Sequence, residues 1–313
     1  MLCLSILLNT FLIAAESDTY KESDKARVRW AKSLDYIEDN DTRQTVIDHI
    51  KADYGLRAYN ENYLIVGYRE GNYNSYVPSD EYINHEVEMQ ISLSYDFGSN
   101  FFGLDEVYSG AITLRSFWQV FTESSPFRET NYNPEVFVTI PTYTDSWIGL
   151  KAVKFSPFAH MSNGQGDITD ADFTGSLPSS LPSTIDPNWL TNRSRSWNYM
   201  YGTLFFQQGP IFAELTAWYR YPEAVTTDDN PDLIDYIGHG SATIYLPYKK
   251  HLFKTMGRYN PETGYGAIEG TWSYPIEGQS TYLYLKVFSG YGESLIDYNN
   301  YVTKFSLGFS FSR

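Results

Sequence analysis

Residues 159–166 read AHMSNGQG and contain the side chains best suited to catalysis. His160 and Ser162 are two positions apart, so on a β-strand their side chains point to the same face. An imidazole in that position can take the proton of a serine hydroxyl and turn the oxygen into a nucleophile. A His-x-Ser pair in a strand is common by chance, however, and Asn163-Gly164 is an ordinary turn pair. The motif therefore needs support from elsewhere in the chain.

That support comes from SRSWN at 194–198, which opens the next expected strand. Antiparallel pairing of the two strands brings Asn198 close to His160. An amide beside an imidazole can hold the ring in the orientation that a general base needs. The three residues therefore predict a serine nucleophile (Ser162), its base (His160) and an orienting group (Asn198).

The elements that must position these residues show strict alternation of apolar and polar side chains. In HEVEMQISLSYDFG, one face carries Val87, Met89, Ile91, Leu93, Tyr95 and Phe97, and the other carries Glu86, Glu88, Gln90, Ser92, Ser94 and Asp96. The C-terminal YVTKFSLGFSFSR repeats this pattern. Period-two alternation predicts strands with one apolar face.

Ten further strands are expected between residues 62 and 292. They lie near 62–70, 108–121, 133–143, 146–162, 196–207, 210–221, 236–248, 251–259, 264–275 and 281–292. Each is long enough to cross a membrane when tilted, and Gly, Pro, Asn and Asp fill the gaps between them. The fold class is thus predicted as all-β, a twelve-stranded antiparallel transmembrane β-barrel over residues 61–313. A soluble β-sandwich is the alternative, but its core would not require so many amphipathic strands.

The orientation of the triad follows from residue parity. Met200, Leu204 and Phe206 share the parity of Asn198, and this apolar set predicts that the triad lies on the lipid-facing wall. The preceding strand gives a mixed signal: Ile148, Leu150, Ala152 and Phe158 share the parity of His160, but so does Lys154.

The N-terminal residues predict export from the cytoplasm. Residues 1–15 are apolar, too short for a membrane-spanning helix, and end in Ala-Ala before a charged stretch, as a secretory signal does. Because no Lys or Arg precedes the apolar run, a buried helix is the alternative. Residues 16–60 are expected to form an N-terminal periplasmic extension. Cys3, the single cysteine, falls within the signal, which excludes disulfides from the mature chain.

Charge and composition narrow the choice of partner. The formal net charge is −15, from 38 acidic and 23 basic residues, and the basic residues form no cluster. Nucleic-acid binding depends on such clusters, so no nucleic-acid partner is expected. Aromatic residues make up 17% of the chain, as suits strands that each have one apolar face.

Six motifs in order closely resemble the outer membrane phospholipase A family. They are SSPFRETNY at 124–132, HMSNG at 160–164, SRSWN at 194–198, TDDNPD at 227–232, TGYG at 263–266 and SGYGESLIDYN at 289–299. The resemblance implies a bacterial outer membrane enzyme that hydrolyses acyl esters, sn-1 and sn-2, of glycerophospholipids and lysophospholipids. Membrane phospholipids would be its substrate, and a homodimer its active form.

The resemblance also implies a calcium (Ca2+) cofactor and its ligands. One ion would be held by the backbone carbonyl of Gln165, the hydroxyl of Ser194 and Ser124 of a second subunit, and would form the oxyanion hole together with the Gly164 N–H. A second ion would use the carboxylates of Asp167 and Asp229. All of these are oxygen ligands, which calcium prefers.

Two departures from the family pattern leave alternatives open. Residues 167–193 form a much longer connection than the family's short turn, and could act as a lid or alter calcium access. Leu114 stands where the family usually has a glutamine at the subunit interface. A porin or other non-catalytic barrel would have the same strands around a polar interior, and an inactive descendant of the family would keep both fold and motifs.

Overall fold

The computed structural model describes residue 43 and residues 55–74, 82–123, 125–142, 148–166, 193–277 and 281–313. The predicted signal (1–15), most of the predicted extension (16–60), Ser124, Asp167 and the rest of the long connection up to residue 192 lie outside the described residues.

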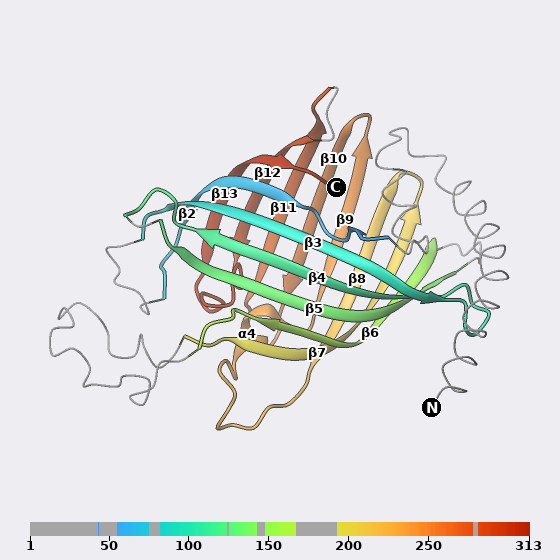
Figure 1. The fold of residues 1–313 in the computed structure, drawn as a ribbon, viewed down its shortest axis with the longest axis horizontal. Coiled ribbons are helices and arrows are strands. Elements are labelled where there is room, and N and C mark those ends of the chain that lie inside the picture. The colour runs from blue at the N-terminus through green and yellow to red at the C-terminus, as the bar shows by residue number, and fades with distance from the viewer. Residues whose placement is uncertain are drawn as a thin grey trace, which may run out of the picture.

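Twelve antiparallel strands close into a barrel (Figure 1). They are β2 (Tyr63–Glu70), β3 (His85–Ser99), β4 (Val107–Trp118), β5 (Phe127–Pro141), β6 (Leu150–Ser162), β7 (Ser196–Gln208), β8 (Ile211–Arg220), β9 (Gly240–Tyr248), β10 (His251–Tyr259), β11 (Gly266–Pro275), β12 (Tyr282–Gly290) and β13 (Val302–Ser310). Each strand pairs with the next in sequence, and β13 pairs with β2 from Thr303↔Glu70 to Ser310↔Tyr63. The predicted fold class is confirmed.

The alternation along β3 and β13 separates lipid from interior as predicted. On β3, Ile91 and Phe97 are exposed, whereas Glu88 and Asp96 are fully buried inside the barrel. On β13, Phe305, Leu307 and Phe309 are exposed, and Lys304 is buried. One face of each strand therefore meets the membrane, while the other builds a polar core.

Ion pairs fill the part of the interior that β2, β3, β4, β5, β12 and β13 enclose. Lys304 Nζ lies 2.7 Å from Glu86 Oε1 and 3.1 Å from Glu88 Oε2. Lys286 Nζ lies 2.8 Å from Glu88 Oε1, and Arg128 Nε lies 3.1 Å from Glu86 Oε2. Buried charges are tolerated when they are paired in this way. This part of the interior is a packed ionic core.

The structure corrects two predicted strand boundaries. β5 begins at Phe127, well before the predicted start at residue 133. The expected strand from 236 to 248 begins only at Gly240, because Leu233–Ile237 form a short helix, α4, that ends at Gly238 with a positive φ of 69°. Within the described part of the chain, no helix is long and apolar enough to cross a membrane.

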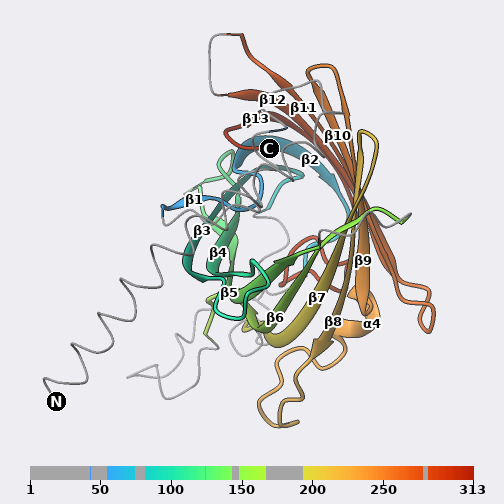
Figure 2. The same ribbon diagram turned by 90° about the vertical axis from the view of Figure 1, so that its right-hand side faces the viewer.

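The two ends of the barrel differ in their connections. Tight turns follow β7 and β9 at the end where the chain also terminates, whereas longer segments join β2 to β3, β6 to β7, β8 to β9 and β12 to β13 at the other end (Figure 2). Outer membrane barrels have short turns on the periplasmic side and long loops outside. The loop-rich end, where β6 finishes and β7 begins, is therefore the extracellular end.

The described part of the predicted extension enters the barrel at the periplasmic end. β1 (Arg57–Ala58) pairs with β3 at Ser94 and Leu93. Arg57 Nη2 donates to Asp96 Oδ1 at 2.8 Å, and the Tyr59 ring stacks on Phe137 inside the barrel. These residues belong to the packed interior of the barrel.

Candidate active site

Two irregularities in β6 decide where the predicted catalytic residues point. Pairing with β7 shifts register between Leu150 and Ala152, and again between Ser156 and Ala159. Each shift adds one residue to β6, as a β-bulge does, and so exchanges inward and outward positions.

The second bulge, around Pro157, reverses the side of the barrel that each side chain at the end of β6 faces. Phe155 and Phe158 are 45% and 48% exposed although they are three residues apart. Between the two bulges even-numbered residues point inward, and after the second bulge they point outward. The prediction that Ala152 faces lipid is therefore wrong, since it is 2% exposed and lies inside the barrel.

Lys154 is inward-facing for the same reason. Its Nζ donates to the Tyr59 hydroxyl at 3.0 Å and lies 4.8 Å from the centre of the Phe137 ring. The mixed parity signal in the sequence thus reflects the bulge. His160 and Ser162 lie beyond it and share the outer face with Phe158.

The structure brings His160 and Asn198 together. The two residues are directly opposite in the β6–β7 pairing, and His160 Nδ1 lies 2.9 Å from Asn198 Oδ1. Ser162 lies opposite Ser196 in the same pairing. On β7, Leu204 is exposed on the same face as Asn198, while Trp197 and Tyr201 are buried inside. His160, Ser162 and Asn198 therefore lie on the lipid-facing wall, near its extracellular end.

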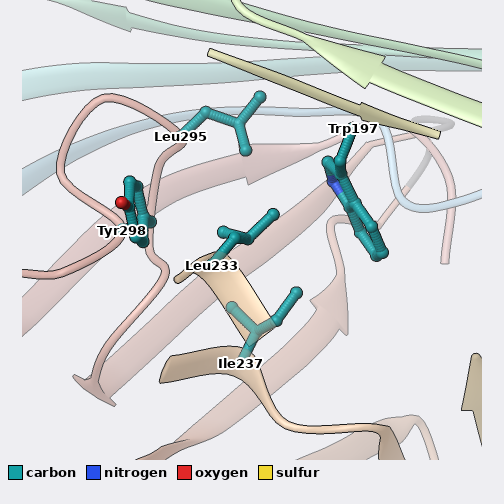
Figure 3. Close-up of a cluster of buried hydrophobic side chains, with 5 residues drawn as sticks. All are labelled: Trp197, Leu233, Ile237, Leu295 and Tyr298. Carbon is teal, nitrogen blue, oxygen red and sulfur yellow. The ribbon is translucent and has the colours of Figure 1, made fainter. Parts of the chain in front are cut away.

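A hydrophobic cluster supports the first residues of β7 from inside the barrel (Figure 3). Trp197 from β7 meets Leu233 and Ile237 from α4 and Leu295 and Tyr298 from the β12–β13 loop. Trp197 precedes Asn198 and points the opposite way. Its packing fixes the backbone from which Asn198 projects toward His160.

Asn163 holds the two ends of the long β6–β7 connection together. Its side chain is 2% exposed. Its Oδ1 accepts from the backbone N–H groups of Gln165 at 3.2 Å and Arg195 at 3.1 Å, and its Nδ2 donates to Arg193 O at 2.8 Å. This positioning role does not follow from Asn163-Gly164 read as a turn pair, because it depends on residues about 30 positions away in the chain.

Gly164 occupies a conformation suited to glycine. Its φ is +62°, and a Cβ built on it would lie 2.8 Å from Cε2 of Tyr132. The close approach leaves the Gly164 N–H beside the end of β6, two residues after Ser162. A backbone N–H at such a turn is a suitable donor for an oxyanion.

Oxygen atoms that could bind a metal ion lie close together where the β6–β7 connection returns to the barrel at Ser194. Ser194 Oγ donates its hydrogen to Asp229 Oδ2 at 2.5 Å. This bond uses the hydroxyl hydrogen, and the lone pairs of a hydroxyl oxygen are the part of the group that can bind a cation. Asn163 holds Gln165, whose backbone carbonyl is another predicted ligand, in the same turn. Neutral and anionic oxygens of this kind suit calcium.

The structure describes three of the five predicted calcium ligands, and none of the five is tested as a ligand. Ser124 and Asp167 lie outside the described residues. The resemblance assigns Asp229 to a second calcium ion. Its carboxylate nevertheless contacts Ser194, which is a predicted ligand of the first ion. Among the described residues, no group of three or more His, Cys, Asp or Glu side chains could hold a metal ion. The ligands predicted for the first ion are a backbone carbonyl and serine hydroxyls, so a search for His, Cys, Asp and Glu side chains does not test that site.

The β8–β9 loop contributes two residues that the sequence reasoning missed. Asn230 is fully buried, and its Oδ1 accepts from the Ser196 N–H at 3.0 Å, which anchors the loop to the start of β7. Glu223 Oε1 accepts from Asn198 Nδ2 at 3.4 Å. Ser196 and Asn198 are far in sequence from Asn230 and Glu223, so these two contacts could be predicted only from the pairing of the strands.

Comparison with known proteins identifies the family. The sequence profile of the phospholipase A1 family matches residues 41–170 and 190–311. Phospholipase A1 of Salmonella typhimurium is 34% identical over 262 residues, which cover 82% of this chain and 81% of that protein. The profile match begins within the predicted extension, a segment that the six motifs did not reach.

Solved structures agree with the sequence match. The calcium-bound dimer of Salmonella typhi outer membrane phospholipase superimposes with a TM-score of 0.71 at 32% identity, over 85% of this chain and 96% of that one. An active-site mutant of the Escherichia coli enzyme, in which an asparagine is replaced by alanine, gives a TM-score of 0.70 at 32% identity over the same shares of the two chains. The chain is a phospholipase of the bacterial outer membrane and belongs to the phospholipase A1 family.

Proposed function

We propose that the protein hydrolyses the sn-1 and sn-2 acyl esters of glycerophospholipids and lysophospholipids through Ser162, His160 and Asn198, with calcium and as a homodimer. The observation that carries the proposal is the 2.9 Å contact between His160 Nδ1 and Asn198 Oδ1 on the lipid-facing wall. An acyl chain in the membrane can lie against this wall with its ester bond near the extracellular end.

The contact with Asn198 sets the chemistry of the imidazole. An amide oxygen accepts hydrogen bonds, so the ring proton lies on Nδ1 and Nε2 keeps its lone pair. Nε2 can then take the proton of Ser162 Oγ as the hydroxyl attacks the ester carbonyl. The protonated imidazole returns this proton to the leaving alcohol, which departs as a lysophospholipid or a glycerol derivative. Water, activated by the same base, then releases the fatty acid.

Negative charge develops on the carbonyl oxygen during both steps. The Gly164 N–H, at a turn with positive φ two residues after Ser162, is the donor that we propose for this oxygen. A bound calcium ion would add positive charge beside the oxyanion, with Gln165 O and Ser194 Oγ as its ligands from this subunit and Ser124 from a second. The hydrogen bond from Ser194 to Asp229 supports this assignment, because it orients the hydroxyl lone pairs.

The packed ionic core favours an enzyme over a porin. Glu86, Glu88 and Lys304 are fully buried in the interior of the barrel. In a wide channel these groups would be hydrated. The catalytic residues are all on the outer wall, where a solute channel would not place them.

Hydrolysis of phospholipid vesicles by the refolded protein, with and without calcium, tests the proposal. Wild type should release fatty acid only with calcium, and Ser162→Ala should lower turnover by about a thousandfold or more, since it removes the nucleophile. Ser241→Ala on β9, two strands from β7, is a matched control that should keep wild-type turnover. Heat-modifiable gel mobility reports whether each variant is folded. Solute flux without hydrolysis, or full activity in Ser162→Ala, would contradict the proposal.

A further inference from the structure

The amide of Asn198 has two ends, and only one of them supports catalysis. If Oδ1 faces His160, the imidazole carries its proton on Nδ1 and is a base at Nε2. If the amide rotates by half a turn, Nδ2 donates to Nδ1, and the ring proton moves to Nε2. An imidazole in that second state directs an N–H at Ser162 and cannot take its proton. Something must therefore keep the amide from rotating.

Glu223 meets Asn198 at its other end. Its Oε1 lies 3.4 Å from Asn198 Nδ2, on the side of the amide away from His160. A carboxylate only accepts hydrogen bonds, so it attracts the NH2 group and repels the carbonyl oxygen. The bond is long, but catalytic hydrogen bonds in free enzymes are often long.

The backbone explains how Glu223 reaches this position. The Tyr221 N–H donates to Asn198 O at 2.8 Å, which extends the β7–β8 ladder beyond the end of β8. Glu223 is two residues further on, diagonally across from Asn198. The Tyr221 side chain crosses β7, and its hydroxyl donates to Pro157 O at 2.6 Å, at the β6 bulge. Tyr221 therefore connects the start of this loop to the strand that carries His160.

We infer that Glu223 is a positioning residue: it fixes the Asn198 amide so that Oδ1 faces His160, and it places a negative charge behind the neutral amide. This inference rests on the proposed Ser162–His160–Asn198 mechanism. Where other hydrolases orient the base with a carboxylate, this chain uses an amide with a carboxylate beyond it. Asn198 thus lies between the negative charge of Glu223 and the imidazole of His160.

Steady-state kinetics in phospholipid–detergent micelles with saturating calcium provides the test. Glu223→Ala should lower kcat about tenfold with KM unchanged, since substrate binding does not involve the amide. Glu223→Gln should give a kcat between those of wild type and Glu223→Ala, because its side-chain carbonyl still accepts from Asn198 Nδ2 but its own amide can also rotate and carries no charge. Glu262→Ala, in the β10–β11 turn at the same end of the barrel, is the matched acidic control and should match wild type.

A double-mutant cycle separates positioning from general support of the loop. Once Asn198→Ala has removed the amide, adding Glu223→Ala should lower kcat no further. Independent effects in the double variant, a change confined to KM, or wild-type kcat in folded Glu223→Ala would overturn the inference. If Glu223→Ala does not fold, a wild-type kcat in Glu223→Lys, which cannot accept the bond, would overturn it as well. The proposed mechanism fails separately, if the wild-type protein releases no fatty acid or Ser162→Ala remains active.

Discussion

At the scale of single residues, Gly164 has very little freedom to change. An alanine would be strained at a φ of +62° and would place its Cβ 2.8 Å from Cε2 of Tyr132. The left-handed conformation costs a residue other than glycine about 1–2 kcal/mol. Any backbone shift that relieves the contact also moves the N–H proposed to bind the oxyanion.

Gly164→Ala should therefore lower kcat by about tenfold or more, since complete loss of one oxyanion donor costs about 100- to 1000-fold. The measurement is fatty acid release from vesicles at saturating calcium. Gly166→Ala is a close control: its added Cβ would meet none of the described residues within 4 Å, so its turnover should stay at the wild-type level. Wild-type turnover in Gly164→Ala would show that this N–H does not stabilise the reaction.

At the scale of elements, the bulge around Pro157 determines which side of the barrel carries the chemistry. Without it, the parity of Lys154 and Ser156 would continue to His160, and the imidazole would point into the interior. The bulge instead lets β6 place Lys154 among the interior aromatics and His160 against lipid. One strand thereby contributes to both environments.

Spin labels can test this reversal directly. Phe155→Cys and Phe158→Cys, made in a Cys3→Ser background and labelled with a nitroxide, should both be accessible to oxygen dissolved in the membrane. A label at Ser156→Cys, which replaces a fully buried residue, should be shielded. A regular strand would put residues 155 and 158 on opposite faces. Accessibility at only one of these two positions would therefore contradict the bulge.

The sequence predicts regular features well and local exceptions poorly. Alternation along β3 and β13 correctly indicates the barrel and its two faces, because side-chain direction in a strand depends only on parity. The bulge at Pro157 reverses that parity, and the sequence signals it only by the proline and by the parity conflict at Lys154, so parity alone puts Ala152 on the wrong face. Glu223 and Asn230 could not be found, because their partners on β7 come close only after the strands have paired.

At the scale of the whole molecule, calcium should matter for activity and not for folding. Closed strand pairing satisfies the backbone of the barrel and stabilises it independently of the proposed ion. A chelator should then stop hydrolysis while heat-modifiable mobility stays unchanged. Full activity in excess chelator would exclude the calcium mechanism.

Calcium titration of variants then tests the ligands. Ser194→Ala should raise the calcium concentration needed for half-maximal activity, because it removes a proposed ligand. Asp229→Ala should raise it less, since Asp229 contacts Ser194 and is proposed for a second ion. An unchanged requirement in Ser194→Ala would remove that residue from the site.

Dimerisation should also control activity if Ser124 of a second subunit completes each calcium site. Specific activity should then rise with the density of protein in the membrane, and covalent cross-linking of the dimer should abolish this dependence. Full specific activity at densities where the protein is monomeric would refute a shared site.

The alternating faces of the strands also bear on how the chain reaches its membrane. Before folding it must pass through the inner membrane, whose translocation machinery retains long apolar helices. Wound as a helix, the β3 segment would expose Glu86, Glu88 and Asp96 to lipid, at about 2.5–3.5 kcal/mol for an acidic residue at the centre of a span. These carboxylates, which pair with lysine and arginine once the barrel has folded, thus disfavour insertion of this segment into the inner membrane as a helix.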